Sequence, residues 1–289
     1  MQSLRYLTEP LTSPKGEKTF LTCNACLSVF ADGWTESCLY SDKITLDIRK
    51  ATNVVLLGCQ VTDLAIYASM KYLEKIMKKY PNKNFFVSGC LAQRLDVELP
   101  KGIERVRLPY SNATHLSNER KPEWQKPFWI SGFKNMPSKK YSDGHTFRYS
   151  YPFRVSKGCS FNCSYCTIKH TRGERAACDQ GLLIRDPYLR NKSMKDNVVL
   201  VADSPSKEEV NWFIDSMLDP KINIHSKGFE IRNVEPRVAL ECKGSIIKAA
   251  KSGMLRLFHA PLQSLDADVL KDMNRNYNNT KNVSSLLSF

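Results

Sequence analysis

The sequence lacks a long apolar run. Across its 289 residues, no stretch approaches the roughly 18 consecutive apolar residues that a membrane-spanning helix needs. Residues 1–18 also lack the apolar segment of a secretory signal peptide. We therefore expect a soluble, cytoplasmic chain with no membrane partner.

Internal repeats and extremes of composition are also absent. Hydrophobic residues make up 42% of the chain and charged residues 25%, which is ordinary for a globular protein. This composition argues against disorder throughout and against collagen-like or fibrous architecture. The length is that of one or two domains.

Acidic residues are scarce relative to basic ones. Asp and Glu total 29 against 43 Lys and Arg, which gives a net charge of +14. Residues 120–175 contain 12 basic and 3 acidic residues, so they hold most of the excess. A clustered excess of this size indicates a polyanionic partner, most often nucleic acid, whereas an even spread would indicate only a solvated surface.

Two regions of alternating strands and helices are predicted. In the first, the strand Asn53–Gly58, a helix over 62–80 and the strand Asn84–Gly89 form a βαβ unit with parallel strands. In the second, strands are expected at 151–156, 197–202, 229–234 and 255–259. Helices are expected from the capping box Ser206-Lys-Glu-Glu209 to about 218, up to about 251, and over 267–273.

This pattern predicts the fold class and the domain organisation. The fold class is α/β, and repeated βα units indicate a barrel or part of one. We expect an N-terminal open parallel α/β domain over 1–100, a connector over 101–150 and a partial barrel over 151–289. The connector is basic, contains four prolines and carries more aromatic residues than a solvated linker would.

Cysteine, in contrast, is abundant, with ten residues. In a reducing compartment, grouped cysteines more often bind metal or carry redox chemistry than form disulfides. Cys159, Cys163 and Cys166 have C-x3-C-x2-C spacing and directly follow the predicted strand 151–156. Three such thiolates can hold an iron–sulfur cubane and leave one iron open to a small molecule. The alternatives are chance clustering and a zinc site, although zinc usually takes four ligands in CxxC pairs.

Cys59 and Cys90 each follow a predicted parallel strand directly. The carboxyl ends of such strands meet at the sheet edge where open α/β folds bind ligands. The two cysteines are therefore candidate ligands of a second site. Buried structural thiols are the alternative, because free cysteine is often buried.

The C-x3-C-x2-C motif at the start of a predicted βα barrel is similar to the signature of radical S-adenosylmethionine enzymes. More narrowly, the chain resembles the methylthiotransferases of that superfamily over about residues 19–280. The matching segments are 58–65, 87–94, 158–166, Thr171-Arg-Gly-Glu174, Asn233-Val-Glu-Pro236, His259-Ala-Pro-Leu-Gln-Ser264 and 269–277.

The resemblance implies two [4Fe–4S] clusters and S-adenosylmethionine as cofactors. It makes Cys159, Cys163 and Cys166 the candidate catalytic cysteines, whose cluster would cleave S-adenosylmethionine reductively to a 5′-deoxyadenosyl radical. The auxiliary cluster, which would bind or deliver sulfur, would be held by Cys59, Cys90 and a third cysteine.

Cys26 is the favoured third ligand, because Asp32-Gly33 then lies at the distance where the family often has an acidic residue. The family usually has a glycine where this chain has Ala25, so Cys23 stays an alternative. The other three cysteines are expected to be structural; they are Cys38, Cys178 and Cys242.

Four polar residues in the matching segments are candidates for lining the cofactor pocket. They are Arg172, Glu235, His259 and Gln263. The alternative is that each caps a helix or is a hydrogen-bonded core group. The chain has Asp203-Ser-Pro after the strand 197–202, where the family more usually has a glycine-containing turn, so the chain departs here from the family pattern on which cofactor contacts at that strand would rest.

The resemblance also implies a substrate class. The family includes enzymes that modify a tRNA adenosine beside the anticodon and enzymes that modify a ribosomal-protein aspartate. The basic charge favours tRNA, through its anticodon stem-loop, and Lys169-His170 resembles the branch that modifies threonylcarbamoyl-adenosine. An electron donor such as flavodoxin or ferredoxin, and a sulfur donor, are the other expected partners.

The chain stops soon after Tyr277, whereas the family generally continues into a small RNA-binding β-barrel. It is expected to be a shortened member or a fragment, and a non-catalytic iron–sulfur or RNA-binding protein is the rival interpretation. Basic residues that alternate with aromatics are then the expected RNA-binding surface, although those aromatics would also suit a packed connector. These basic residues are Arg120, Lys121, Lys126, Lys134, Lys139, Lys140, Arg148 and Arg154.

Overall fold

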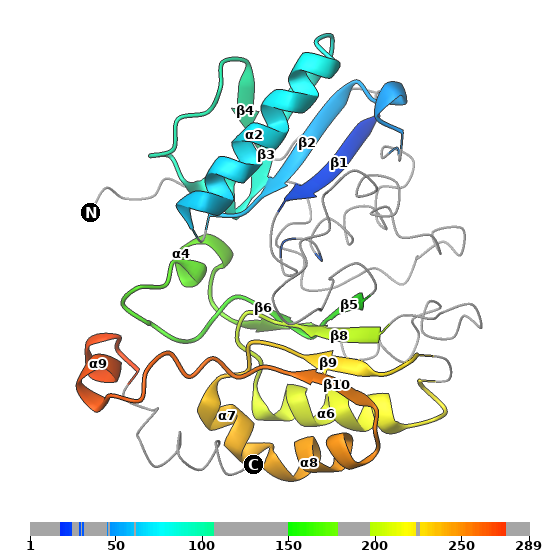
Figure 1. Cartoon of the computed structure of the whole chain (residues 1–289), viewed down its shortest axis with the longest axis vertical. Coiled ribbons are helices and arrows are strands. Elements are labelled where there is room, and N and C mark those ends of the chain that lie inside the picture. The colour runs from blue at the N-terminus through cyan, green and yellow to red at the C-terminus, as the bar shows by residue number, and fades with distance from the viewer. Residues whose placement is uncertain are drawn as a thin grey trace. The chain divides into compact units, whose positions relative to one another are not determined.

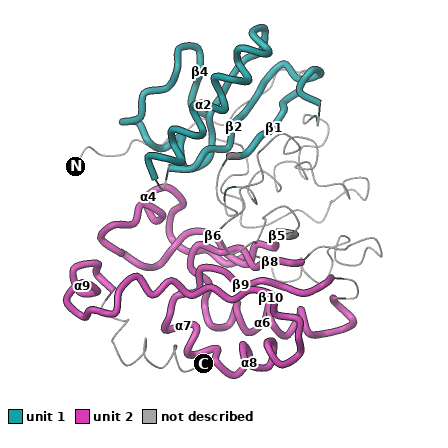
Figure 2. The backbone as a smooth tube through the Cα atoms, in the orientation of Figure 1, with its two compact units in different colours: residues 1–138 teal, residues 139–289 magenta. Residues whose placement is uncertain are grey.

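The computed structural model describes residues 18–24, 29, 31, 45, 47–60, 62–106, 150–178, 197–223 and 226–275. The chain divides into two compact units, an N-terminal unit of residues 1–138 and a C-terminal unit of residues 139–289 (Figure 2). Residues 107–149 of the predicted connector, and with them most of its basic and aromatic residues, lie outside the described part. Within the described residues, no helix is long and apolar enough to cross a membrane.

The N-terminal unit contains a four-stranded parallel sheet. Its strands, in spatial order, are β1 (Thr19–Asn24), β2 (Asn53–Gly58), β3 (Asn84–Gly89) and β4 (Ile103–Arg105). Every residue of β2 is buried, as its continuous apolar sequence predicts for a strand covered on both faces. The predicted βαβ unit is confirmed, while β4 was not predicted, because Ile-Glu-Arg is too short and too polar to show a strand pattern.

Helix α2 (Asp63–Lys79) connects β2 to β3 (Figure 1). Thr62 caps its first turn by accepting a hydrogen bond from the Ala65 N–H at 3.1 Å. Its apolar face contributes Leu73, which is fully buried, to a core that includes Leu56 and Val87 of the strands. The sequence predicted this helix over 62–80.

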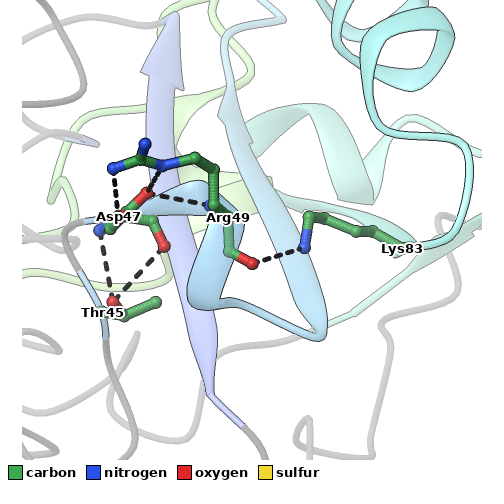
Figure 3. A network of polar contacts seen from close by, with 4 residues as sticks. All are labelled: Thr45, Asp47, Arg49 and Lys83. Atoms are coloured by element: carbon green, nitrogen blue, oxygen red, sulfur yellow. Dashed lines mark hydrogen bonds and ion pairs between the residues drawn. The ribbon is translucent and has the colours of Figure 1, made fainter.

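A surface network joins the segments that precede β2 and β3 (Figure 3). Asp47 caps the short 3-10 helix η1 (Ile48–Lys50) by accepting from the Arg49 N–H at 3.0 Å, and it pairs with the Arg49 guanidinium at 2.8 Å. Hydrogen bonds from Arg49 lower the pKa of Asp47 to about 2. The Asp47 N–H donates to Thr45 Oγ1 at 3.2 Å, and Lys83 Nζ donates to the Arg49 carbonyl at 3.4 Å. The network therefore lies at the amino end of the sheet, away from the cysteines that follow the strands.

The C-terminal unit also contains a four-stranded parallel sheet. Its strands, in spatial order, are β10 (Leu255–Phe258), β9 (Phe229–Ile231), β8 (Asn197–Val201) and β5 (Ser150–Arg154). Its main helices are α6 (Lys207–Leu218), α7 (Pro236–Glu241), α8 (Lys243–Lys251) and α9 (Ala267–Asp272). Figure 1 shows α6, α7 and α8 along one face of the sheet. The predicted α/β class with parallel strands is confirmed in both units.

Local sequence signals account for most of these boundaries. Both hydrogen bonds of the predicted capping box at Ser206 and Glu209 are present at the start of α6. The strand predicted over 229–234 ends earlier, at Ile231, because Asn233 adopts a left-handed conformation with φ 59°. The helix predicted to end near residue 251 is divided into α7 and α8 at Cys242.

The strand predicted over 151–156 is likewise divided. After β5 the chain forms the two-residue strand β6 (Ser156–Lys157), which pairs antiparallel with β7 (Ala176–Ala177). The segment between them contains the five-residue helix α4 (Ile168–Arg172). The hairpin and α4 were not predicted, because elements this short do not show periodicity.

Candidate metal centres

The C-x3-C-x2-C motif lies in the cysteine loop, defined here as residues 158–167 between β6 and α4 (Figure 1). Cys159, Cys163 and Cys166 are all partly buried. The Cys166 N–H donates to the Cys163 carbonyl at 3.1 Å, and the Phe161 N–H donates to Cys159 Sγ at 3.4 Å. The loop follows β5 and β6, so it begins at the carboxyl edge of the parallel sheet, where the sequence placed it.

The environment of Cys159 and of Cys166 favours the protonated form of each thiol. Burial is the main cause that raises the pKa of Cys159 and of Cys166, and nearby thiols raise both further. The Phe161 N–H and the Ser204 hydroxyl act in the opposite direction on Cys159. Because metals bind thiolates, loading this loop with metal would release protons.

Among the residues that the structure describes, no three Cys, His, Asp or Glu side chains come close enough to hold one metal ion. A cubane takes each thiolate on a different iron atom, so its ligands need not meet at one point.

The base of the cysteine loop is fixed by Glu209 at the start of α6. The Ser156 hydroxyl donates to Glu209 Oε2 at 3.0 Å, and Arg175 donates to Glu209 Oε1 at 2.6 Å. The Glu209 side chain is only 4% exposed. One buried carboxylate therefore joins β6 to the chain that enters β7.

The entry to the loop requires a glycine. Gly158 has φ +78°, and a Cβ at this position would lie 2.2 Å from the Glu174 carbonyl oxygen and 2.6 Å from the Gly173 carbonyl oxygen. The Cys159 N–H donates to the Gly173 carbonyl at 3.1 Å. The start of the cysteine loop is therefore packed directly against the backbone that follows α4.

The end of the loop is fixed by the last residue of α9 and the residues that follow it. The Ser164 N–H donates to the Met273 carbonyl at 3.1 Å, and the Ser164 hydroxyl donates to the Asp272 carbonyl at 2.8 Å. The Arg275 guanidinium donates to the Tyr165 hydroxyl at 2.9 Å. The matching segments 158–166 and 269–277 are thus in direct contact, which their separation in sequence does not reveal.

Arg172 is the first of the four predicted pocket residues. Its side chain is 3% exposed and its Nε donates to Asp203 Oδ2 at 2.6 Å, so it forms a buried ion pair. Asp203, two residues beyond β8, was not predicted as a site residue. Its position directly after a buried strand was the signal available in the sequence.

Glu235 is also engaged within the protein. It caps α7 by accepting from the Arg237 N–H at 2.9 Å, and it lies 3.6 Å from the Arg275 guanidinium. Helix capping was the alternative role that the sequence left open for this residue. Arg275 therefore connects the chain after β9 with Tyr165 in the cysteine loop.

His259 and Gln263 are both exposed, beyond the carboxyl end of β10. His259 Nδ1 lies 3.2 Å from Asn233 Oδ1, and Asn233 follows the neighbouring strand β9. Gln263 has a left-handed backbone with φ 66°. Parallel strands place their carboxyl ends at one edge, so these residues share that edge with Asp203 and the cysteine loop.

Cysteines of the N-terminal unit lie at the corresponding edge of its own sheet. Cys59 follows β2 and Cys90 follows β3, and their preceding residues, Gly58 and Gly89, are register partners. Both cysteines are buried, at 8% and 5% exposure. Gly89 has φ +74°, and a Cβ there would lie 3.2 Å from the Gly58 carbonyl oxygen, so the glycines allow the two strand ends to pack closely.

The two alternative third ligands differ in position. Cys23 lies within β1, paired in register with Leu57, and is 1% exposed. Cys26 lies outside the described residues, as does Cys38. The last register pair of β1 is Asn24 with Gly58, so Cys23 lies inside the paired strand, whereas Cys59 follows the end of β2.

The remaining two cysteines are placed outside both candidate centres. Cys178 follows β7, where its N–H donates to the Val155 carbonyl at 2.8 Å. Cys242 is buried between α7 and α8, and burial raises its pKa to about 11. A thiol with so high a pKa stays protonated and unreactive at neutral pH.

No protein-family model matches the chain. Among curated proteins, the ribosomal protein uS12 methylthiotransferase RimO of Hydrogenobaculum sp. (strain Y04AAS1) is 27% identical over 243 residues, which are 83% of this chain and 55% of that protein. The tRNA-2-methylthio-N(6)-dimethylallyladenosine synthase of Campylobacter concisus (strain 13826) is 26% identical over 254 residues, which are 81% of this chain and 56% of that protein.

These relatives confirm the resemblance to the methylthiotransferases that the sequence motifs indicated. They include proteins named for a ribosomal-protein substrate and proteins named for a tRNA nucleoside. The chain spans about half the length of the curated relatives it matches.

Proposed function

We propose that the chain carries the radical S-adenosylmethionine core of a methylthiotransferase, with a [4Fe–4S] cluster held by Cys159, Cys163 and Cys166. One observation carries this proposal. The three thiols share one loop at the carboxyl edge of a parallel sheet, and that loop is hydrogen-bonded to the segment 272–275, which lies within a second segment of family resemblance.

The finer description of the fold is part of the proposal. The four parallel strands of the C-terminal unit, with helices between them, would be part of a (β/α) barrel whose active site lies at the carboxyl edge. The proposed domains keep the limits of the sequence prediction, at 1–100, 101–150 and 151–289.

A bound cluster would supply one electron to S-adenosylmethionine at this site. The chain's own residues would bind and orient the cofactor. We propose that Asn233, His259 and Gln263 would contact it, because their polar groups are exposed at the same edge. The sequence proposed Arg172 and Glu235 for the same role. We propose that they would instead hold the surrounding chain in position through their buried ion pairs.

A second [4Fe–4S] cluster is proposed for the N-terminal unit, on the auxiliary cysteines Cys26, Cys59 and Cys90. The register pairing of Gly58 with Gly89, directly before Cys59 and Cys90, supports this proposal. Cys26 is proposed as the third ligand because it follows β1 in sequence, whereas Cys23 lies inside that strand. A cluster with three protein ligands keeps one iron available for the sulfur to be transferred.

The proposed substrate is a tRNA adenosine beside the anticodon, in the threonylcarbamoyl-adenosine branch. The net charge of +14 supports a polyanionic substrate. A flavodoxin or ferredoxin would donate electrons, and a separate sulfur donor would complete the cycle. The alternative substrate is a ribosomal protein, because one of the relatives above carries that function in its name.

Mass spectrometry on cells with and without the gene tests the proposal. tRNA nucleosides and peptides of ribosomal protein uS12 are analysed from the same cultures, and the deletion strain is complemented with the parent or with Cys163→Ala. Loss of a methylthio-adenosine that only the parent restores supports the proposed function. Loss of a methylthio group from uS12 alone supports the alternative substrate, and no change in either contradicts both.

A further inference from the structure

One buried carboxylate holds both ends of the segment that contains the cysteine loop. Asp203 Oδ2 accepts a hydrogen bond from the Gly158 N–H at 2.9 Å and another from Arg172 Nε at 2.6 Å. Gly158 opens the cysteine loop, and Arg172 is the last residue of α4 behind it. A single oxygen atom of a residue just beyond β8 therefore fixes where the loop begins and where its following helix ends.

The pair is deeply buried, with side-chain exposures of 3% for Arg172 and 4% for Asp203. Hydrogen bonds that involve charged groups are stronger than neutral ones, and removing one partner leaves the other charge uncompensated away from water. An uncharged acceptor in place of Asp203 would hold Gly158 and Arg172 less firmly.

The chain after β8 therefore contacts the first residue of the cysteine loop and the last residue of the helix that follows it. This is the place where the chain has Asp203-Ser-Pro instead of the turn usual in the proteins it resembles.

We infer that Asp203 is a positioning residue, which holds the cysteine loop in its ligand arrangement and, paired with Arg172, balances the charge beside the proposed cluster. The charge-balancing role, the second half of this inference, rests on the proposed function. The positioning role, its first half, concerns the iron-free protein alone.

Thiol alkylation of the iron-free protein tests the first half. Asp203→Asn is compared with Asp215→Asn, a matched control in an exposed pair with Lys248 at 3.1 Å. Iodoacetamide labelling of each cysteine is followed by peptide mass spectrometry. We expect labelling of the cysteine loop to be at least about tenfold faster in Asp203→Asn, while the buried Cys242 keeps its parental rate.

If the cysteine loop of Asp203→Asn is labelled within about twofold of its rate in Asp215→Asn, the positioning role is overturned. The expected tenfold increase corresponds to only about 1.4 kcal/mol. If Cys242 also becomes reactive, Asp203→Asn has unfolded, and the alkylation is repeated with Arg172→Lys instead. This variant keeps the charge but loses the Nε donor, so we expect faster loop labelling at a parental Cys242 rate. Unchanged loop labelling in Arg172→Lys would overturn the inference.

A redox titration of the reconstituted protein, monitored by electron paramagnetic resonance, tests the second half. Asp203→Asn leaves the Arg172 charge unbalanced, so the midpoint potential should become more positive than in Asp215→Asn. Arg172→Gln should shift the potential in the opposite direction. Shifts of the same sign, or none, would overturn the electrostatic role. A parent that takes up no iron would instead refute the proposed function and leave the alkylation result to decide the positioning role.

Discussion

Gly158→Ala should destabilise the C-terminal unit far more than an alanine placed at a glycine of this unit that has open space around it. The left-handed backbone, at φ +78°, costs an alanine about 1–2 kcal/mol. The new Cβ would also lie 2.2 Å from the Glu174 carbonyl oxygen, and forcing the backbone apart adds about 1–3 kcal/mol. We expect the melting temperature of this unit to fall by roughly 5–15 °C, at about 2–4 °C per kcal/mol.

Two other glycines of the same unit separate these contributions. Gly253 follows α8 with φ +71°, and a Cβ added there would meet no atom within 4 Å, so Gly253→Ala carries the backbone cost alone. Gly244 lies within α8, with ordinary φ and open space, so Gly244→Ala should be neutral or stabilising by about 0.5–1 kcal/mol.

Differential scanning calorimetry of the iron-free variants provides the measurement. The expected order of melting temperatures, from highest to lowest, is Gly244→Ala, then Gly253→Ala, then Gly158→Ala. If Gly158→Ala melts with Gly253→Ala, the close packing of the loop entry against Glu174 is wrong. If Gly158→Ala has the same melting temperature as Gly244→Ala, the left-handed conformation of Gly158 is wrong as well.

Three further predictions concern the auxiliary cysteines, a buried thiol and the basic connector. Replacing all three auxiliary cysteines with alanine should leave reductive cleavage of S-adenosylmethionine but abolish sulfur transfer, and a folded variant that cannot cleave the cofactor would refute the division of roles. Because the folded-state pKa of Cys242 is raised to about 11 from the usual 9.0, its neutral thiol stabilises fully below about pH 9 and loses this contribution toward pH 11. The difference in melting temperature between the parent and Cys242→Ala should therefore narrow across that window, and a constant difference would contradict the burial argument. Changing Lys139 and Lys140 to Glu should weaken tRNA binding and flatten its salt dependence without loss of iron, whereas an unchanged salt slope would place the RNA elsewhere.

The elements that the sequence predicted well are those with long, consistent local signals. The buried strand β2 and helix α2 follow directly from a continuous apolar run and from apolar residues at helical spacing. The capping box of α6 is a local contact between residues three apart, so it can be recognised without tertiary structure. Strand β4, helix α4 and the β6–β7 hairpin were missed because two to five residues do not establish a period.

The sequence indicated the candidate ligands but not the contacts that support them. Spacing alone indicated the cysteine loop, and the predicted strand ends indicated Cys59 and Cys90 as candidates. The role of Asp203 depends on contacts with Gly158, 45 residues away, and with Arg172, 31 residues away. Arg275 reaches Tyr165 across 110 residues. No local pattern encodes such contacts, which is why the buried ion pairs of Arg172 and Glu235 were not predicted.

The central claim is that the cysteine loop holds one of two clusters, and iron content tests it most directly. Anaerobically reconstituted parent protein should contain about eight iron atoms per chain, and the variant with Cys159, Cys163 and Cys166 changed to alanine should contain about four. About four iron atoms in the parent, or the same content in both proteins, would contradict the account.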